Sequence, residues 1–466
     1  MKKTVTCILA AAMITAAFAG CGTKNTANKN GEFTLTIGGW PTQDYPDSAK
    51  RYDDWKKEIE SKTPGLTVIP YTSEITLENY LAEAASGQLP DLYSQPFTEP
   101  KKVIDAGYVA DVTDEMKKRG YDTAIKKNVL DIVTKDGRYY GIPYKGYMMS
   151  LYCNKKLFEQ AGLTDADGLP QYPDTWEEVA KTGQIIKEKT GKAGFAFQTM
   201  DKLGGWMFMN IAWAFGTEFE TQEDGKWVTH VNEPEGVAAL QYIKDLKWKY
   251  NILPDNILLD NSEIDKMYAQ DNVAMLIGCY DENTVPAPVI QYNMDKNNMA
   301  ATVLPAGPAQ RSSQLGGTTY LMKNGVTEQQ ISAAFDWIEM EGSGMKATDD
   351  VIERKKQTIE DKISENGPKA FIIKPSFSVW ASGEMKNKLD EIYKEKSTVD
   401  VKNFTGMYDE DNKVTLRPEE PYYCQQLYGL LSTAIQNVLL DKNADPQSEM
   451  DEVAKTFQNQ FLNQLN

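Results

Sequence analysis

Apolar residues recur along this chain at two spacings, one typical of strands and one typical of helices. Residues 31–40 alternate apolar side chains with threonines, which predicts a strand with one buried face. Residues 76–85 repeat apolar side chains at the i, i+3, i+4 and i+7 spacing of a helix that Thr76 would cap. Further strands are predicted over 66–71, 89–96 and 272–278, and further helices over 47–61, over 175–189 and from 232 onward. This alternation predicts α/β layers with largely parallel sheets.

Local signals indicate where some of these elements begin. The sequence Thr175-Trp-Glu-Glu178 has the spacing of a capping box, in which each side chain bonds to the other residue's backbone N–H. Residues 342–368 are charged and poorly periodic, which predicts an insertion or a solvated helix.

The first 21 residues, MKKTVTCILAAAMITAAFAGC, predict an export signal. Two lysines precede an apolar stretch, residues 4–18, which is too short to span ~30 Å of hydrocarbon. The arrangement resembles the signal of bacterial lipoproteins, although Phe18 stands where such signals more often have leucine. It implies a signal peptide over 1–20, lipid on Cys21 and a membrane-tethering segment over 21–31. An ordinary secretory signal with an incidental cysteine is the alternative.

Composition restricts the class of protein. The 466 residues are 41% hydrophobic, enough for a large core and for two or three domain-sized units. No later segment approaches 18 consecutive apolar residues. The net charge of −17 argues against nucleic acid and against an anionic lipid surface as ligand.

Several kinds of catalytic chemistry lack their residues. A single histidine, His230, excludes HExxH and multi-histidine metal sites, and a serine triad would have to use it. Neither a GxxxxGK[ST] loop nor a GxGxxG fingerprint is present, so we expect no cofactor and no metal. The 67 acidic residues leave a paired-carboxylate site open. Any two of Cys153, Cys279 and Cys424 could form a disulfide, and the sequence does not say which.

Motifs spread over nearly the whole chain resemble those of extracellular solute-binding proteins of the maltodextrin-binding kind. In chain order they include LPDLYSQPFTEPKKVIDAGYVADVTD, DGRYYGIPY, LYCNKKLFEQAGL, PDTWEEVAKTGQIIKEKTGKAGFAF, NEPEGVAALQYIKDLKWKYNILPDN, MYAQDNVAMLIGCYDEN, LGGTTYLMKNG and QISAAFDWIEM. Each motif alone is weakly specific, and their order after an export signal carries the resemblance.

The resemblance implies two α/β lobes, hinge crossings between them and a ligand cleft between the lobes. Crossings are expected near Ile142–Tyr147, Thr302–Leu304 and Glu341–Lys346. The expected segments are 32–144 and 303–342 for lobe I, and 145–302 and 343–466 for lobe II.

Candidate ligand residues follow from the chemistry of sugars. A sugar ring has apolar C–H faces and a rim of hydroxyls, so aromatic side chains match the faces and carboxylates or amides match the rim. Trp40, in a Gly/Pro-rich loop, and Trp206, after Gly204-Gly205, lie where periodicity does not require an aromatic, and we expect them on opposing sides of the cleft. The resemblance, or proximity to these aromatics, adds Asp44, Gln95, Tyr147, Tyr280, Asp281, Trp380 and Tyr428. Packing in the core, or solvation for the polar residues, is the alternative for each of them.

The function implied is that of a binding subunit, not an enzyme. We expect a lipid-anchored, monomeric protein outside the cytoplasm that captures an oligosaccharide and delivers it to the permease subunits of an ABC importer in the membrane. The alternatives are a binding protein for a non-sugar solute such as a polyamine, iron or an osmolyte, an exported glycan-processing enzyme with two catalytic carboxylates, or a structural surface lipoprotein without a ligand.

Overall fold

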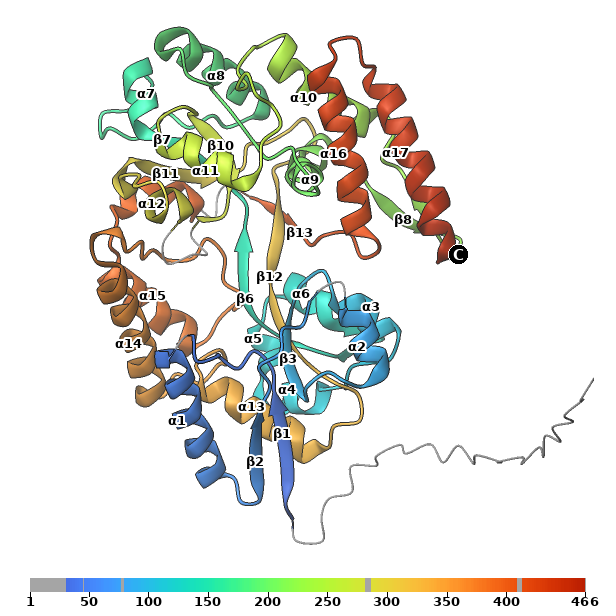
Figure 1. The fold of residues 1–466 in the computed structure, drawn as a ribbon, viewed down its shortest axis with the longest axis vertical. Helices are drawn as coiled ribbons and strands as arrows, with labels where there is room; N and C mark the ends of the chain where they lie inside the picture. Colours follow the sequence, from blue (N-terminus) through green and yellow to red (C-terminus); the bar gives the residue numbers. More distant parts are fainter. Residues whose placement is uncertain (1–30, 45, 77–78, 281–285, 409–412, 466) are drawn as a thin grey trace, which may run out of the picture.

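The computed structural model describes residues 31–44, 46–76, 79–280, 286–408 and 413–465, and in it two lobes lie end to end along the longest axis (Figure 1). One sheet has the order β13-β12-β3-β1-β2, to which β6 adds by pairing with β12, and its strands β1, β2 and β3 lie in lobe I. Lobe II contains the three-stranded sheet β10-β7-β11. The strands of the two sheets are β1 (Phe33–Ile37), β2 (Leu66–Pro70), β3 (Leu92–Pro96), β6 (Ile142–Met148), β7 (Ser150–Asn154), β10 (Met275–Gly278), β11 (Met299–Val303), β12 (Ser312–Met322) and β13 (Thr415–Arg417).

The hydrophobic alternation of β1 organises lobe I. Leu35 and Ile37 are buried, and β1 runs parallel to β2 and β3 as predicted. Helices α1 and α13 contribute Ile59 and Trp337 to the same core. The helices and short strands of this part are α1 (Pro46–Lys62), α2 (Tyr80–Ser86), α3 (Pro100–Asp105), α4 (Thr113–Arg119), α5 (Tyr121–Ala124), α6 (Lys127–Leu130), β4 (Thr134–Lys135), β5 (Arg138–Tyr139) and α13 (Glu328–Met340).

In lobe II the prediction of parallel strands is wrong, because β7 pairs antiparallel with both β10 and β11. Alternation of helices and strands does not fix the direction in which a distant strand returns. The predicted capping box is confirmed at the start of α8, where the Glu178 N–H donates to Thr175 Oγ1 at 3.2 Å. The helices and hairpin strands here are α7 (Lys155–Ala161), α8 (Trp176–Thr190), α9 (Leu203–Phe215), β8 (Glu220–Glu223), β9 (Lys226–Thr229), α10 (Pro234–Trp248), α11 (Asn261–Ala269), α12 (Ala287–Ile290), α16 (Cys424–Leu440) and α17 (Pro446–Gln460).

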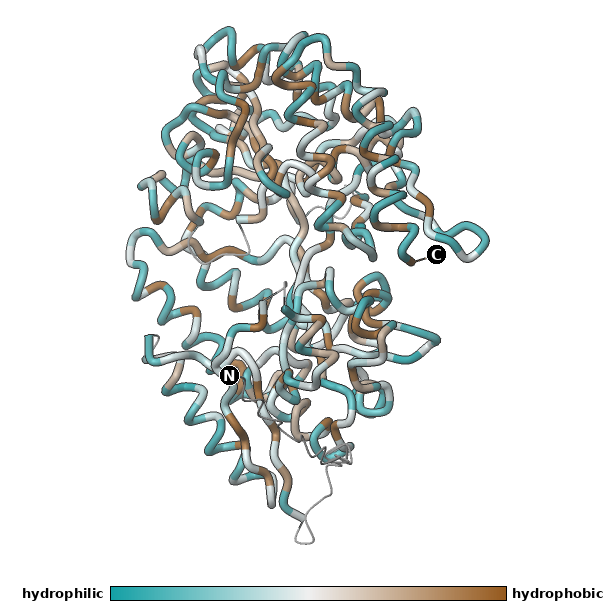
Figure 2. Tube along the Cα trace, turned by 45° about the vertical axis from the view of Figure 1, so that its right-hand side comes forward, coloured by the Kyte–Doolittle hydropathy of each residue, from teal (hydrophilic) through white to brown (hydrophobic). Residues whose placement is uncertain are grey.

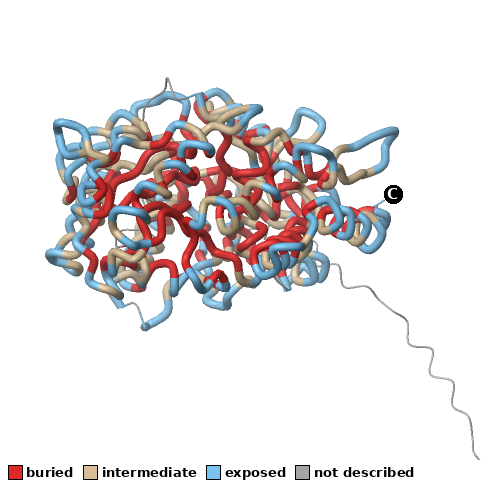
Figure 3. The backbone as a smooth tube through the Cα atoms, turned by 90° about the horizontal axis from the view of Figure 1, so that it is seen from above, coloured by how far each residue is buried: buried red, intermediate tan, exposed pale blue. Residues whose placement is uncertain are grey.

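Hydrophobic residues concentrate inside each lobe, and polar residues cover the outer helices (Figure 2). Seen from above, buried backbone fills the centre and exposed backbone surrounds it (Figure 3). The helices of the described ranges include none with the length and apolarity required for a membrane crossing.

Two antiparallel strands connect the lobes. β6 leaves lobe I and pairs with β12, with Gly316 opposite Tyr147 and Thr318 opposite Lys145. β12 pairs with β13 at Ser312–Gln314 and with β3 at Thr318–Met322, so this strand spans both lobes. We call this pair the hinge ribbon. The expected first crossing at Ile142–Tyr147 coincides with β6.

The other crossings lie at different residues from those expected. Thr302–Leu304 remains in lobe II, since Thr302 in β11 pairs with Leu151, and the return crossing is β12. Helix α14 (Asp349–Asn366) follows the expected third crossing, yet it lies beside α1 of lobe I together with α15 (Glu384–Lys396) (Figure 1). An ion pair of 3.1 Å between Arg354 and Glu58 connects α14 to α1. The charged segment 342–368 is therefore largely a helix, the second of the two alternatives predicted for it. This helix lies beside lobe I.

Close packing of α9 against α16 depends on glycine. A Cβ on Gly205 would lie 2.3 Å from the Tyr428 carbonyl oxygen, and the Gly205 N–H donates to Ser432 Oγ at 2.8 Å. The Gly204-Gly205 pair thus brings the two helix backbones together at the start of α9.

We predict that Gly205→Ala lowers the free energy of unfolding by ~2–3 kcal/mol, because backbone atoms must move apart to admit the methyl group. Gly429→Ala on α16 is the matched control, since its added Cβ would meet nothing within 4 Å. The control should be neutral or stabilising by up to ~1 kcal/mol. Urea denaturation measures both values, and equal stabilities of the two variants would contradict the packing argument.

Candidate functional site

The hinge ribbon presents one exposed face between the lobes. Side chains alternate along a strand, so Lys145 and Tyr147 on β6 share a face with their paired residues on β12. Lys145 is exposed and Tyr147 is half-buried, whereas the intervening Gly146 is buried. A Cβ on Gly316 would lie 2.1 Å from the Tyr147 ring, so this ring lies over the glycine. The exposed face of the hinge ribbon, which we call the floor, is therefore open to a ligand.

On the lobe I side, this floor leads into a cavity of about 330 Å³. Its walls come from β6, from α14 and α15, and from the segment 371–380 between those helices. Tyr144 lines it, and the Tyr144 ring stacks on Tyr320 with centroids 4.3 Å apart. The remaining apolar lining includes Phe371, Ile372, Ile373, Phe377, Val379, Trp380 and Leu389.

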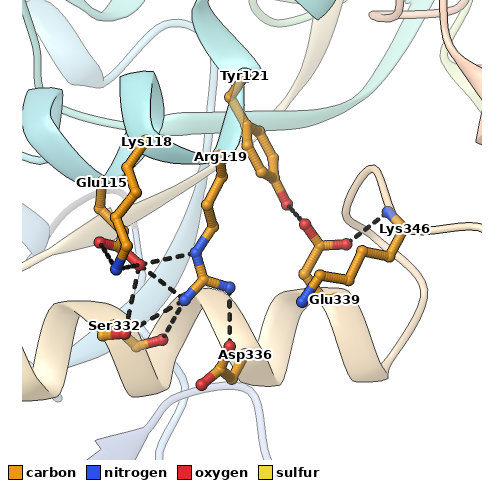
Figure 4. Close-up of polar contacts among 8 residues, drawn as sticks. All are labelled: Glu115, Lys118, Arg119, Tyr121, Ser332, Asp336, Glu339 and Lys346. Atoms are coloured by element: carbon orange, nitrogen blue, oxygen red, sulfur yellow. Dashed lines mark hydrogen bonds and ion pairs between the residues drawn. The ribbon is translucent and has the colours of Figure 1, made fainter.

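Trp380 lines this cavity next to a polar network that joins α4 and α5 to α13; Figure 4 shows the network. The Trp380 ring packs on Tyr121 with centroids 5.8 Å apart. Tyr121 donates to Glu339 Oε1 at 2.5 Å, and the Lys346 backbone N–H donates to Glu339 Oε2 at 2.6 Å. Arg119 of α4 forms an ion pair of 2.8 Å with Asp336, which lies on α13 as Glu339 does. The network ties α4, α5, α13 and the segment after α13 together on the side of Trp380 away from the lining.

On the lobe II side, Glu419 collects three hydrogen bonds from three different elements. Tyr428 of α16 donates to Glu419 Oε1 at 2.6 Å, and the side chains of Gln314 and Trp206 also bond to this carboxylate. Burial raises the pKa of Glu419, and the Tyr428 hydrogen bond opposes that rise. Gln314 lies two residues before Gly316 on the same face of β12, where its side chain is buried. A half-buried indole and a carboxylate thus lie side by side at one end of the floor.

More carboxylates are buried near this end. Burial raises the pKa of Glu420 to about 7, and it raises the pKa of Glu220 to about 8. Trp213 Nε1 donates to Glu420 at 3.3 Å, and the Tyr422 N–H donates to Glu220 at 3.0 Å. Buried carboxyl groups, with Arg417 beside them, are therefore concentrated in lobe II near the segment before α16.

The two lobes also contact each other directly beside this end of the floor. The Tyr422 hydroxyl donates to Asp105 at the end of α3, at 2.6 Å. The ammonium of Lys101 lies 5.5 Å from the centroid of the Tyr422 ring. These contacts join the segment before α16 to lobe I.

The structure places two expected ligand residues away from the exposed floor. Trp40 is only 6% exposed and packs between Tyr52 and Trp337, so it belongs to the core of lobe I. Gln95 is 2% exposed and lies opposite the buried Thr319, on the inner face of the sheet. Tertiary packing, not the local loop sequence, determines the position of both side chains.

The remaining candidates divide between the site and its surroundings. Trp206 and Tyr428 meet at Glu419 on the lobe II side, Tyr147 lies on the hinge ribbon, and Trp380 lines the lobe I cavity; Tyr428 and Trp380 are mostly buried. Tyr280 instead donates its hydroxyl to Asp265 and packs on Tyr152 in lobe II. Asp44 is exposed and accepts a hydrogen bond from Thr42. Cys21 and Asp281 lie outside the described residues.

Sequence reasoning missed Glu419, Tyr144 and the lysines of α14. The run RPEEPYY before the last helices was the available signal for Glu419, since it places acids and aromatics at a loop-to-helix junction. No sequence signal pointed to the lysines of α14, because a charged helix normally faces solvent. Cys153, Cys279 and Cys424 are all free thiols in the structure. Among the described residues, no cluster of three metal-ligating acidic, histidine or cysteine side chains occurs.

The family model for bacterial extracellular solute-binding proteins matches residues 54–343 of this chain. The chain is 25% identical to a lactose-binding protein of Rhizobium radiobacter, over 72% of this chain and 74% of that one. It is 24% identical to an arabinooligosaccharide-binding protein of Bacillus subtilis, over 53% and 55%. The crystal structure of a cyclic α-maltosyl-1,6-maltose binding protein from Arthrobacter globiformis superposes with a TM-score of 0.65 and 20% identity, covering 91% of this chain and 98% of that one.

The protein is thus a two-lobed member of the bacterial extracellular solute-binding family. This membership confirms the expected fold class and a binding role in place of catalysis. The family is extracellular, so the protein acts outside the cytoplasm.

We predict a pH-dependent stability that depends on Glu220. Its pKa rises from 4.5 to about 8 in the folded protein, so the folded state binds a proton that the unfolded state releases between these values. The free energy of unfolding should therefore fall as pH rises through this window. Glu220→Gln should reduce that fall, with a gain on the order of 3 kcal/mol at pH 9 and little change at pH 4.

Urea denaturation at the two pH values tests this expectation. Glu159→Gln, at an exposed position on α7, is the matched control and should track the unmodified protein at both pH values. Parallel pH dependences of Glu220→Gln and the unmodified protein would contradict the assignment.

Proposed function

We propose that this protein captures an oligosaccharide between its lobes, as a monomer, and delivers it to the permease subunits of an ABC importer. The observation that carries the proposal is the group formed by Trp206, Tyr428 and Glu419 at the end of the exposed floor. The half-buried indole of Trp206 offers a flat apolar surface to a sugar ring, and Glu419 can accept from sugar hydroxyls.

The relatives support a carbohydrate as the solute. Their names specify lactose, arabinooligosaccharide and maltodextrin, and the A. globiformis protein is named for a cyclic maltose oligomer. The hinge ribbon supplies part of the movement that such a role needs, because its two strands can bend as the lobes close. The chain also crosses between α15 and residues 401–407, where Asn403 accepts a hydrogen bond from Lys155 of lobe II at 2.8 Å.

We predict that Trp206→Ala weakens oligosaccharide binding more than 10-fold, since truncating an aromatic anchor typically costs ~2 kcal/mol or more. The apo melting temperature should change little. Calorimetric titration with a ligand found by a thermal-shift screen of oligosaccharides measures the affinity. Chromatography of the bound sugar should recover it intact.

Trp40→Ala is the contrasting variant, because its ring packs between Tyr52 and Trp337. It should cost ~3–5 kcal/mol of stability while the folded fraction keeps its affinity. Unchanged affinity in Trp206→Ala would overturn the placement of the site. Repeated hydrolysis of the sugar, abolished by replacing one carboxylate, would overturn the binding role itself.

We also propose that lipid on Cys21 anchors the protein to the cell membrane after removal of residues 1–20. The sequence AFAGC before a polar segment supports it. Cys21→Ala should abolish fatty-acid labelling and leave the protein unprocessed or released, as measured by metabolic labelling and cell fractionation. Cys7→Ala is the control, since that cysteine lies within the expected signal peptide. Labelling that persists in Cys21→Ala would contradict the anchor.

A further inference from the structure

The cavity on the lobe I side has a charge opposite to that of the whole chain. The chain carries a net charge of −17, with 67 acidic and 50 basic residues. Among the described residues that line this cavity, Asp390 is the single carboxylate. The cationic residues of the lining are Lys145, Lys355, Lys362, Lys374 and Lys386. The chain as a whole has more acidic than basic residues, so its average composition does not account for five lysines and one carboxylate in this lining.

The single carboxylate, Asp390, already forms ion pairs with two of these lysines. Lys374 Nζ lies 3.1 Å from Asp390 Oδ1, and Lys386 Nζ lies 3.2 Å from Asp390 Oδ2. Lys355 and Lys362 stand seven residues apart on α14, two turns of helix, with Thr358 of the same face between them. Within the described chain, neither of these two lysines has a carboxylate at ion-pair distance. The α14 wall therefore brings positive charge to the cavity, opposed beyond ion-pair distance by Glu341 for Lys355 and by Glu365 for Lys362.

The local electrostatics agree with this arrangement. Burial lowers the pKa of Lys355, and Lys362 and Arg51 lower it further, while Glu341 opposes the change. Burial also lowers the pKa of Lys362, and the charges of Lys145 and Arg51 act in the same direction. Glu341 itself accepts a hydrogen bond from Tyr320. Like charges facing a partly desolvated cavity repel one another, and an anion bound among them would relieve that repulsion.

The cavity also has the shape and lining of a sugar site. Its volume of about 330 Å³ falls within the ~300–1,000 Å³ of small-molecule sites. Tyr144, Phe377 and Trp380 supply an aromatic side beside the lysines. Lys145 belongs both to the cavity and to the exposed face of the hinge ribbon, which leads to Gln314 and Glu419. Thr318 and Gln314 are four residues apart on β12, or ~13 Å, a span suited to an oligomer.

We propose that the solute is an anionic oligosaccharide, one that carries carboxylate or sulfate groups, with its charged residue bound among the lysines of α14. The inference rests on the proposed function and specifies its substrate class. Hydroxyls at the other end of the same ligand would meet Glu419 and Trp206.

The test compares charged oligosaccharides with their uncharged counterparts on the full mature protein. One pair is an oligogalacturonate and its methyl ester, which keeps the shape and removes the charge. The other pair is a sulfated galactan oligosaccharide and its desulfated form. By calorimetry, at least one charged member should bind 10-fold or more tightly than its neutral counterpart, and the pair that shows this identifies the anionic group. Its affinity should fall with added salt.

Variants of the lysine wall locate the effect. Lys355→Gln and Lys362→Gln should each weaken binding of the charged member about 10-fold and leave the neutral member unaffected. Lys356→Gln is the matched control, because this neighbour on α14 does not line the cavity. Melting temperatures of all three variants verify folding.

The remaining outcomes distinguish failure of the anionic substrate class from failure of the proposed function. Neutral oligosaccharides that bind as tightly as the charged ones, or better, would overturn the anionic class and leave the proposed function intact. Inorganic phosphate or sulfate that binds as tightly as the charged oligosaccharide would assign the lysines to a free anion and overturn the inference. Failure of every glycan to bind would refute the proposed function and the inference with it.

Discussion

The antiparallel pairing of β6 with β12 is the constraint on which the rest of the molecule depends. These strands hold the two lobes together, and they form the floor on which the candidate site is built. The pairing needs glycine at two neighbouring positions. A Cβ on Gly316 would meet the Tyr147 ring, and a Cβ on Gly317 would meet the Lys145 carbonyl oxygen at 2.3 Å. A side chain at either position would push apart the strands that any lobe closure has to bend.

The charges around this floor are distributed unequally between the lobes. Lobe II contributes buried acids, with Glu419 and Glu420 held by tyrosine and tryptophan donors. Lobe I contributes lysines from helices that follow α13 in the sequence. Burying either set costs free energy unless partners compensate for the lost water. The native structure supplies donors to the acids, whereas the lysines are compensated only in part by Asp390 and Glu341.

Much of the fold could be predicted from the sequence, because its signals are local. The alternation of β1 and the capping box of α8 need only neighbouring residues, and both are confirmed. Trp40 shows the limit of such reasoning. Its loop looked free of core contacts, but its packing partner Trp337 comes from a helix nearly three hundred residues later, and no local pattern records that contact. Trp206 could be named as a candidate because its position next to a glycine pair is itself local, whereas Glu419 becomes a candidate only through partners on three separate elements.

The attachment of α14 to α1 has a consequence for the order of events during capture. The ion pair between Arg354 and Glu58 fixes the lysine wall to lobe I, so this wall is complete while the lobes are apart. An acidic ligand would then be steered to lobe I first, at a rate that depends on ionic strength. Contacts with Glu419 and Trp206 would form only when lobe II swings over, at a rate set by bending of the hinge ribbon. Encounter and retention would thereby be separate kinetic steps, one governed by long-range charge and the other by short-range hydrogen bonding.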